Sequence, residues 1–121
     1  MVNNRIRKLV KQRAQGKCED CGVQTNPYYA VVGHLNHARD SNYANPQNIV
    51  SRCLLCETEY HLKHADNPSV IGLTKKNNDA TIFGHFKRLT QNDQAYLVKK
   101  YRLTLERVLK RLDLTETIGF I

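Results

Sequence analysis

The sequence predicts a small α+β fold in which two short strands lie between helices. Three features predict it: apolar residues at helical spacing near both ends, a β-branched and aromatic stretch in the middle, and four cysteines in two close pairs. The chain has 121 residues, 40% hydrophobic and 25% charged, as expected of one small soluble domain. A core of this size is modest and often needs a further constraint such as a bound metal.

The first element is a helix over residues 4–15. Ile6, Leu9 and Val10 recur at helical spacing, and Gly16 follows directly. Glycine is common just beyond the last turn of a helix, so the helix should end there.

A β-hairpin and a second helix follow. The stretch "YYAVVGH" (28–34) is typical of a strand, and "NIVSRC" (48–53) of a shorter one that pairs back on it across the polar loop 36–47. Residues 54–65 have a helical pattern that "DNP" ends, because the residue before a proline disfavours helical backbone.

The C-terminal half is predicted to be helical after a polar connection. Residues 67–81 contain "GLTKKNND" and are the segment expected to be flexible, and a short helix should cover 80–89. Thr90 and Asp93 match a helix-start pattern and open an amphipathic helix over 91–112. Its apolar stripe, a core or partner-binding face, comprises Val98, Tyr101, Leu105, Val108 and Leu112.

The predicted organisation is a core over residues 1–66 and a helical extension over 67–121. The net charge is +8, and residues 1–17 hold six Lys or Arg and no acid. The helix 91–112 is also basic, whereas residues 18–66 are slightly acidic. Positive ends around a nearly neutral centre suit a polyanion such as DNA, although charged helix faces are commonly just solvated.

The N-terminus, "MVNNRIRKLVKQR", has no apolar signal segment, and no run approaches membrane-spanning length. We therefore expect a cytoplasmic protein without membrane contact, or one in the host cytoplasm if a phage encodes it. Paired C-x2-C motifs in a reducing compartment are more often metal sites than disulfides.

The four cysteines predict a structural zinc site. They form two C-x2-C pairs with 31 residues between the pairs, Cys18 with Cys21 and Cys53 with Cys56. Four thiolates fill the tetrahedral coordination of zinc and leave no open position. Such a zinc should hold the fold and take no part in catalysis.

The region between the cysteine pairs resembles the HNH endonuclease family. The resemblance covers about residues 5–65 and rests on "RAQGKCEDCG" and "VVGHLNHARDSNYANPQNIVSRCLLC". In these stretches His34 ends a strand fourteen residues before Asn48, and the second cysteine pair follows. The resemblance implies a ββα-metal core that hydrolyses DNA.

In that family a histidine, here His34, takes a proton from the water that attacks phosphorus, a task that suits imidazole because its pKa lies near working pH. The family's asparagine, here Asn48, braces the loop that carries the base. One divalent cation, Mg²⁺ or else Mn²⁺, Ni²⁺ or Zn²⁺, neutralises charge on the phosphate and the leaving oxygen.

Two positions depart from the family pattern. Gly33 stands where the family has an Asp or His ligand, and Glu57 replaces the histidine that usually follows the second cysteine pair. Glu57 and His61 are i and i+4 on one helix face, so together they can bind the catalytic cation. His37 is a third candidate ligand, or alternatively the base in a shifted register.

Four basic residues lie near these positions in the sequence. They are candidates for contacts with DNA phosphates, although lone basic residues are usually surface charges: Arg39, Arg52, Lys63 and His64. His85 lies outside the motif and is expected to be structural.

Three functions follow. The first is an active DNA endonuclease, the second a zinc module that kept the fold and binds nucleic acid without cleaving it, and the third a docking module whose helix 91–112 pairs with a protein partner or a second copy. His34 and Asn48 favour the first function, since a module that only binds does not need them. Gly33 and Glu57 favour the second.

Overall fold

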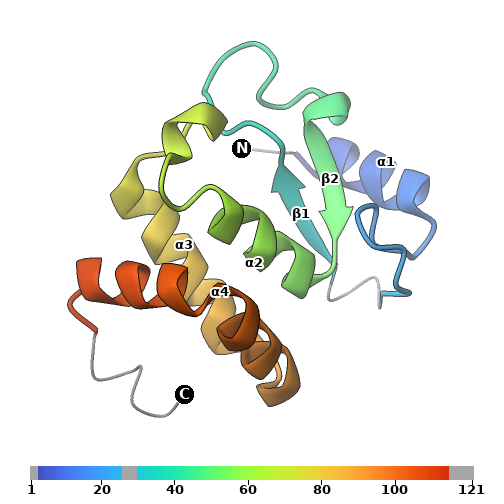
Figure 1. The fold of residues 1–121 in the computed structure, drawn as a ribbon. Coiled ribbons are helices and arrows are strands. Elements are labelled where there is room, and N and C mark those ends of the chain that lie inside the picture. Colours follow the sequence, from blue (N-terminus) through green and yellow to red (C-terminus); the bar gives the residue numbers. More distant parts are fainter. Residues whose placement is uncertain (1–2, 26–29, 115–121) are drawn as a thin grey trace. The chain divides into compact units, whose positions relative to one another are not determined.

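The computed structural model describes residues 3–25 and 30–114 (Figure 1). It is α+β, with four α-helices and a two-stranded antiparallel sheet among these residues. The chain divides into two compact units, 1–57 and 58–121. The division falls inside a helix, before the boundary at residue 66 that the sequence suggested.

The first unit begins with helix α1 (Asn4–Ala14). The Asn3 side chain caps it by accepting a hydrogen bond of 2.9 Å from the backbone N–H of Ile6. Gln15 and Gly16 both have positive φ and end the helix. The predicted helix is thus present, one residue shorter.

The hairpin consists of β1 (Val31–His34) and β2 (Ile49–Arg52), with His34 opposite Ile49 in the register. A short 3-10 turn, η1 (Pro46–Asn48), leads into β2. Both predicted strands are therefore present and antiparallel, while residues 28 and 29 of the first lie outside the described residues. Val10 of α1 packs on Ile49, which attaches the helix to the hairpin.

Arg13 connects three segments of this unit. Its guanidinium makes two hydrogen bonds to the Glu19 carboxylate, of 2.7 and 2.8 Å, and donates to the carbonyls of Pro46 and Ile49. Glu19 in turn accepts a hydrogen bond of 2.8 Å from the backbone N–H of Ser51. The turn that carries the first cysteine pair is thereby held against β2.

Helix α2 (Leu54–Lys63) follows β2 and runs from the first unit into the second. The second unit continues with η2 (Pro68–Ile71) and α3 (Lys75–Arg88). The prediction of a flexible connection over 67–81 is therefore wrong over most of its length. Thr74 explains the early start of α3, because its hydroxyl caps the helix by accepting from the N–H of Asn77.

Helix α4 (Gln91–Arg111) begins where the sequence predicts, with the Thr90 hydroxyl accepting a hydrogen bond of 3.2 Å from the N–H of Asp93. A kink interrupts it at Tyr101, whose φ and ψ of −124° and 28° are not helical. The Tyr101 hydroxyl donates to Glu59, 2.8 Å away. The buried apolar residues of α4 are Leu97, Val98, Leu105, Val108 and Leu109.

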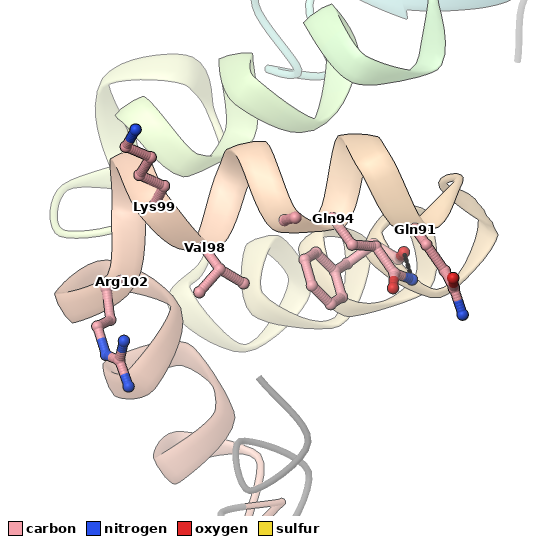
Figure 2. A pocket seen from close by; sticks show the side chains of 7 residues that line it. Gln91, Gln94, Val98, Lys99 and Arg102 are labelled. Atoms are coloured by element: carbon pink, nitrogen blue, oxygen red, sulfur yellow. Dashed lines mark hydrogen bonds between the residues drawn. The ribbon is translucent and has the colours of Figure 1, made fainter.

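A pocket of about 440 Å³ lies in the second unit, lined by side chains of α3 and α4. Figure 2 shows Lys99 and Arg102 toward one end of it and Gln91 toward the other. Across residues 3–25 and 30–114, no helix has the length and apolar character required to span a membrane.

Candidate metal sites and catalytic loop

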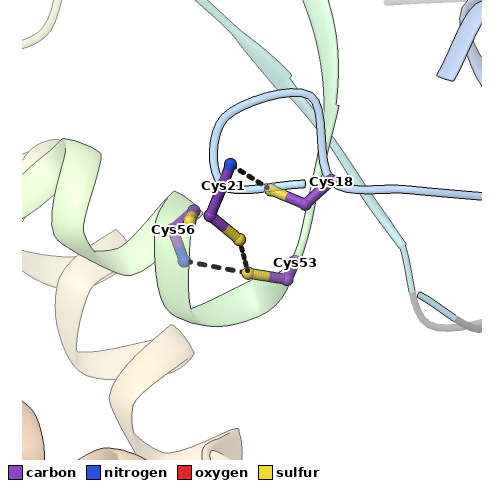
Figure 3. Close-up of side chains that lie close together, drawn as sticks. All are labelled: Cys18, Cys21, Cys53 and Cys56. Carbon is purple, nitrogen blue, oxygen red and sulfur yellow. Dashed lines mark hydrogen bonds between the residues drawn. The ribbon is translucent and has the colours of Figure 1, made fainter. Parts of the chain in front are cut away.

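The four cysteines come together at one point of the first unit (Figure 3). Cys18 and Cys21 lie on the turn after α1, and Cys53 and Cys56 lie where β2 gives way to α2. Their sulfurs are all within 4.8 Å of one another, with 3.9 Å between those of Cys21 and Cys53. Sulfurs bound tetrahedrally to one zinc are about 3.8 Å apart, so the cluster has the size for a metal such as zinc.

The backbone around the cysteines is arranged to accept thiolates. In each pair the N–H of the second cysteine donates to the sulfur of the first, at 3.5 Å from Cys21 to Cys18 and 3.4 Å from Cys56 to Cys53. Gly22, with φ of 77°, closes the first turn. Because N–H groups that donate to sulfur stabilise its negative charge, these contacts suit a cluster that holds a cation.

The thiols differ in acidity. Burial acts to raise the pKa of Cys18, but backbone N–H groups outweigh it and lower that pKa to about 7. Burial raises the pKa of Cys53 to about 11 and also raises that of Cys56. Because burial opposes the ionisation of Cys53 and Cys56, a bound cation would favour the thiolate form of these two residues.

His34 is the last residue of β1, and its side chain is buried. The imidazole stacks on Tyr43 with 4.2 Å between ring centroids, and Arg39 lies over the Tyr43 ring at 4.3 Å. Burial, and then the positive charge of Arg39, lower the pKa of His34 below its usual 6.5. Its Nε2 atom has no hydrogen-bond partner within the part of the chain that the structure describes.

Asn48 holds the loop that follows His34. Its Oδ1 accepts from the N–H of Asn36 at 2.8 Å, and its Nδ2 donates to the carbonyls of Asn36 and Tyr43 at 2.8 and 3.3 Å. The Asn48 backbone carbonyl also accepts from the N–H of Leu35. The bracing hydrogen bonds expected of Asn48 are therefore present.

Glu57 occupies the space beside Gly33. A Cβ atom added at Gly33 would lie 2.7 Å from Glu57 Cδ and closer still to both carboxylate oxygens. A side chain at position 33 would therefore force the Glu57 carboxylate to move. The absence of a side chain at Gly33 makes room for this carboxylate.

Arg52 lies inside the protein, which corrects its assignment as a DNA contact. It is 2% exposed and donates to Glu57 at 2.9 Å and to Asp20. A buried guanidinium that neutralises two carboxylates does not reach a phosphate outside the protein. Arg39 and Lys63 are exposed and stay available, while His64 is half-buried.

The second unit places His61 beside His85. His61 is 1% exposed, and its Nδ1 lies 2.8 Å from Oδ1 of Asn78. The ring of His85, on α3, is 5.8 Å from that of His61, and a ligand nitrogen of each lies within 4.8 Å of the other. Burial, followed by the charges of His61 and Arg88, lowers the pKa of His85 to about 4, so its ring is neutral at pH 7.

The neighbours of His37 and His85 differ from those that the sequence suggested, which were Glu57 and His61 for His37 and no site residue for His85. His37 lies beside His34, with 5.2 Å between ring centroids, so it belongs to the surroundings of His34. The histidine beside His61 is His85, which the sequence analysis set aside as structural. Only the packing of α3 on α2 within the second unit brings them together, and no local spacing indicates it.

Comparison with models of known protein families, with curated proteins and with solved structures gives no match. A function for this chain therefore has to come from its own residues and their geometry.

Proposed function

We propose that this chain is a metal-dependent endonuclease of the HNH type that hydrolyses DNA phosphodiester bonds. The observation that carries the proposal is His34, a buried imidazole with a lowered pKa, whose Nε2 has no hydrogen-bond partner among the described residues. It directly precedes a loop that Asn48 holds by three side-chain hydrogen bonds. A buried nitrogen without a partner costs about 1–3 kcal/mol, and functional sites are where such groups are retained.

His34 is the general base. Its lowered pKa keeps the ring neutral near pH 7, so Nε2 can accept the proton of the attacking water. Tyr43 and Asn48 position His34, the first by stacking on the imidazole and the second by holding the loop backbone. Neither needs to touch the substrate.

Glu57 and His61 are the proposed ligands of the catalytic cation. They are one helical turn apart on α2 and therefore share a face of that helix. A bound divalent cation, Mg²⁺ or a transition metal, would supply positive charge for the phosphate and the leaving oxygen. The ligand set of carboxylate and imidazole accepts either kind of ion.

The four cysteines hold a structural zinc in this proposal. A four-thiolate site has no open coordination position, so this ion takes no part in hydrolysis. Purified protein should then carry about one tightly bound zinc per chain.

DNA is the proposed substrate because exposed positive charge gathers on α1. A shallow hollow of about 380 Å³ there is lined by Asn4, Arg7, Lys8, Lys11 and Gln12. Lysine and arginine side chains bind backbone phosphates without regard to base sequence, so no sequence specificity is expected from this surface.

A second candidate function is a DNA-binding module that has lost catalysis, and the Arg52–Glu57 ion pair favours it. The pair is buried, at 2% and 5% side-chain exposure, and it already occupies one carboxylate oxygen of Glu57. A carboxylate committed to a guanidinium is a weaker ligand for a catalytic cation.

Plasmid nicking decides between the two. Supercoiled plasmid is incubated with the wild-type protein, with His34→Ala and with Asn77→Ala, in Mg²⁺, Mn²⁺, Ni²⁺ or a chelator. Asn77 is exposed on α3. We expect metal-dependent nicking that His34→Ala abolishes and the control Asn77→Ala retains. A folded, zinc-loaded protein that binds DNA but cleaves it with no metal would overturn the nuclease proposal and leave the binding module.

A further inference from the structure

The loop that Asn48 braces borders a hollow of about 320 Å³ in the first unit, which we call the amide hollow. Its volume is that of a small ligand site. Among the described residues that line it, none has a positive charge or an apolar side chain. Five carry side-chain amides and one carries a carboxylate: Asn36, Asn42, Asn45, Gln47 and Asn48, with Asp40.

This lining disfavours two common classes of ligand. A phosphate group needs positive charge, and the Asp40 carboxylate would repel it. A cation site gains affinity from each charged ligand, and Asp40 is the one charged residue among the described residues of the lining. An amide offers both a donor N–H group and an acceptor oxygen. The hollow therefore favours an uncharged ligand with donors and acceptors of its own.

Two of the amides are available to such a ligand. Asn36, Asn45 and Asn48 each use the side-chain oxygen to accept a backbone N–H of the loop, at 2.7 to 2.9 Å. The side chains of Asn42 and Gln47 are exposed and make no hydrogen bond with any described residue, since both take part in the loop through backbone groups. The first three amides thus shape the loop, and the other two face the solvent unused.

The amide hollow lies close to the proposed base. Asn36 follows His34 by two residues, so their Cα atoms are at most about 7 Å apart. Tyr43, which stacks on the His34 imidazole, directly follows Asn42. Neighbouring base pairs of DNA are about 3.4 Å apart, so about 7 Å corresponds to two steps. The uncharged hydrogen-bonding group that a duplex presents at this distance from a phosphate at His34 is the edge of a base.

We propose that the amide hollow reads one DNA base within about two base pairs of the cleaved phosphate, through Asn42 and Gln47. The preferred base is adenine, because an Asn or Gln amide makes paired hydrogen bonds with N6 and N7 of adenine in the major groove. The α1 surface holds the backbone, and the amide hollow supplies the base preference. The inference rests on the proposed function for DNA as the ligand, but base selection in binding needs no cleavage.

The test is selection of bound DNA without cleavage. Zinc-loaded wild-type protein is mixed with short duplexes of random sequence, with no other divalent cation added, and the bound duplexes are sequenced. We expect one adenine to be favoured over the other bases by about 5- to 150-fold, the range for a paired contact between an amide and adenine. Asn42→Ala/Gln47→Ala should lose this preference but keep its zinc content, circular dichroism spectrum and average affinity for DNA.

A change of one atom in the DNA makes the result specific. 7-Deazaadenine lacks the N7 acceptor but still pairs with thymine, so in a selected duplex it should weaken binding by the wild type and not by the double variant. Asn77→Ala, which changes an exposed asparagine on α3, should behave as the wild type. A wild type that selects no base, or a base other than adenine, would overturn the proposal, as would a double variant that keeps the preference.

Failure of the nuclease proposal has a different signature. Adenine selection by a protein that nicks plasmid with no metal would overturn hydrolysis and leave the amide hollow as a reader of DNA sequence. A folded protein that binds no duplex would overturn both proposals.

Discussion

The four-cysteine cluster and the surroundings of Glu57 and His61 are both candidate metal sites, but they differ in how they are held. The cysteines contact backbone N–H groups and one another, and burial raises the pKa of two of them, Cys53 and Cys56. Glu57 instead pairs with Arg52, and His61 with Asn78. We therefore expect the shape of the first site to depend on a bound cation, whereas protein groups hold the second.

The largest expected effect is the loss of a cysteine. Cys53→Ser removes one of four thiolates, and a structural zinc of this kind contributes about 10–16 kcal/mol of apparent binding free energy to the folded state. We expect loss of bound zinc and loss of folded structure in the first unit, measured by metal analysis and amide hydrogen exchange. Removal of cations bound outside the cysteine cluster with a mild chelator should leave the protein folded. If the protein unfolded after this mild treatment, the second site would also depend on a cation, and the proposed difference between the two sites would be wrong.

The next effect concerns the buried ion pair. Arg52→Gln leaves the Glu57 carboxylate buried without its cation and should destabilise the protein by about 3–5 kcal/mol in urea. Added Mn²⁺ should recover more stability in this variant than in the wild type, because the ion can replace the lost charge. Equal effects of Mn²⁺ on both proteins would show that Glu57 does not contact the cation.

A smaller effect tests the contact of Gly33 with Glu57. Gly33→Ala places a methyl group against the carboxylate and should cost about 1–3 kcal/mol. Gly84, in the middle of α3, has no atom within 4 Å of an added Cβ, so Gly84→Ala should instead stabilise by about 0.5–1 kcal/mol. In the double variant Gly33→Ala/Glu57→Ala the cost of the methyl group should disappear, as a double-mutant cycle would measure.

The smallest effect is a shift in the pH profile of cleavage. Burial and Arg39 lower the pKa of His34, so the fraction of neutral base falls only below the usual 6.5 as the solution is acidified. kcat/KM should therefore reach its plateau at a lower pH than an exposed histidine would allow. Arg39→Gln should move the acidic limb toward higher pH, since it removes a positive charge near the ring. If the acidic limb of the Arg39→Gln profile did not move, a titrating group other than His34 would be responsible for it.

The elements of the fold were largely predictable, because each has a local signal. The Thr90 cap, the strand around Val32 and the cysteine spacing all act within a few residues. The prediction of a flexible connection over 67–81 was wrong because it relied on a local signal, the polar composition of a loop. Thr74 instead starts a helix there, and Asn78 is buried against His61. Tertiary packing outweighed composition in that segment.

The candidate sites divide in the same way. The cysteine cluster and the hydrogen bonds of Asn48 follow from short motifs and agree with the sequence analysis. The burial of Arg52 depends on the surroundings of the end of β2, and the approach of His85 to His61 depends on how α3 packs against α2. In the sequence Arg52 resembles a surface residue that could contact DNA, and only the structure shows that it pairs with buried Glu57 and with Asp20.

The hydrogen bonds of Asn48 have a further consequence for engineering. They join Asn48 to Leu35 and Asn36, directly after His34, and so close the loop between β1 and β2 at its base. The position of His34 is therefore fixed by these hydrogen bonds and not by the length of the loop beyond them. Lengthening a closed loop costs only about 0.6 kcal/mol per doubling. Residues 40–42, which precede Tyr43, are therefore a segment in which insertions could be selected for new substrate preferences while the geometry of His34 is kept.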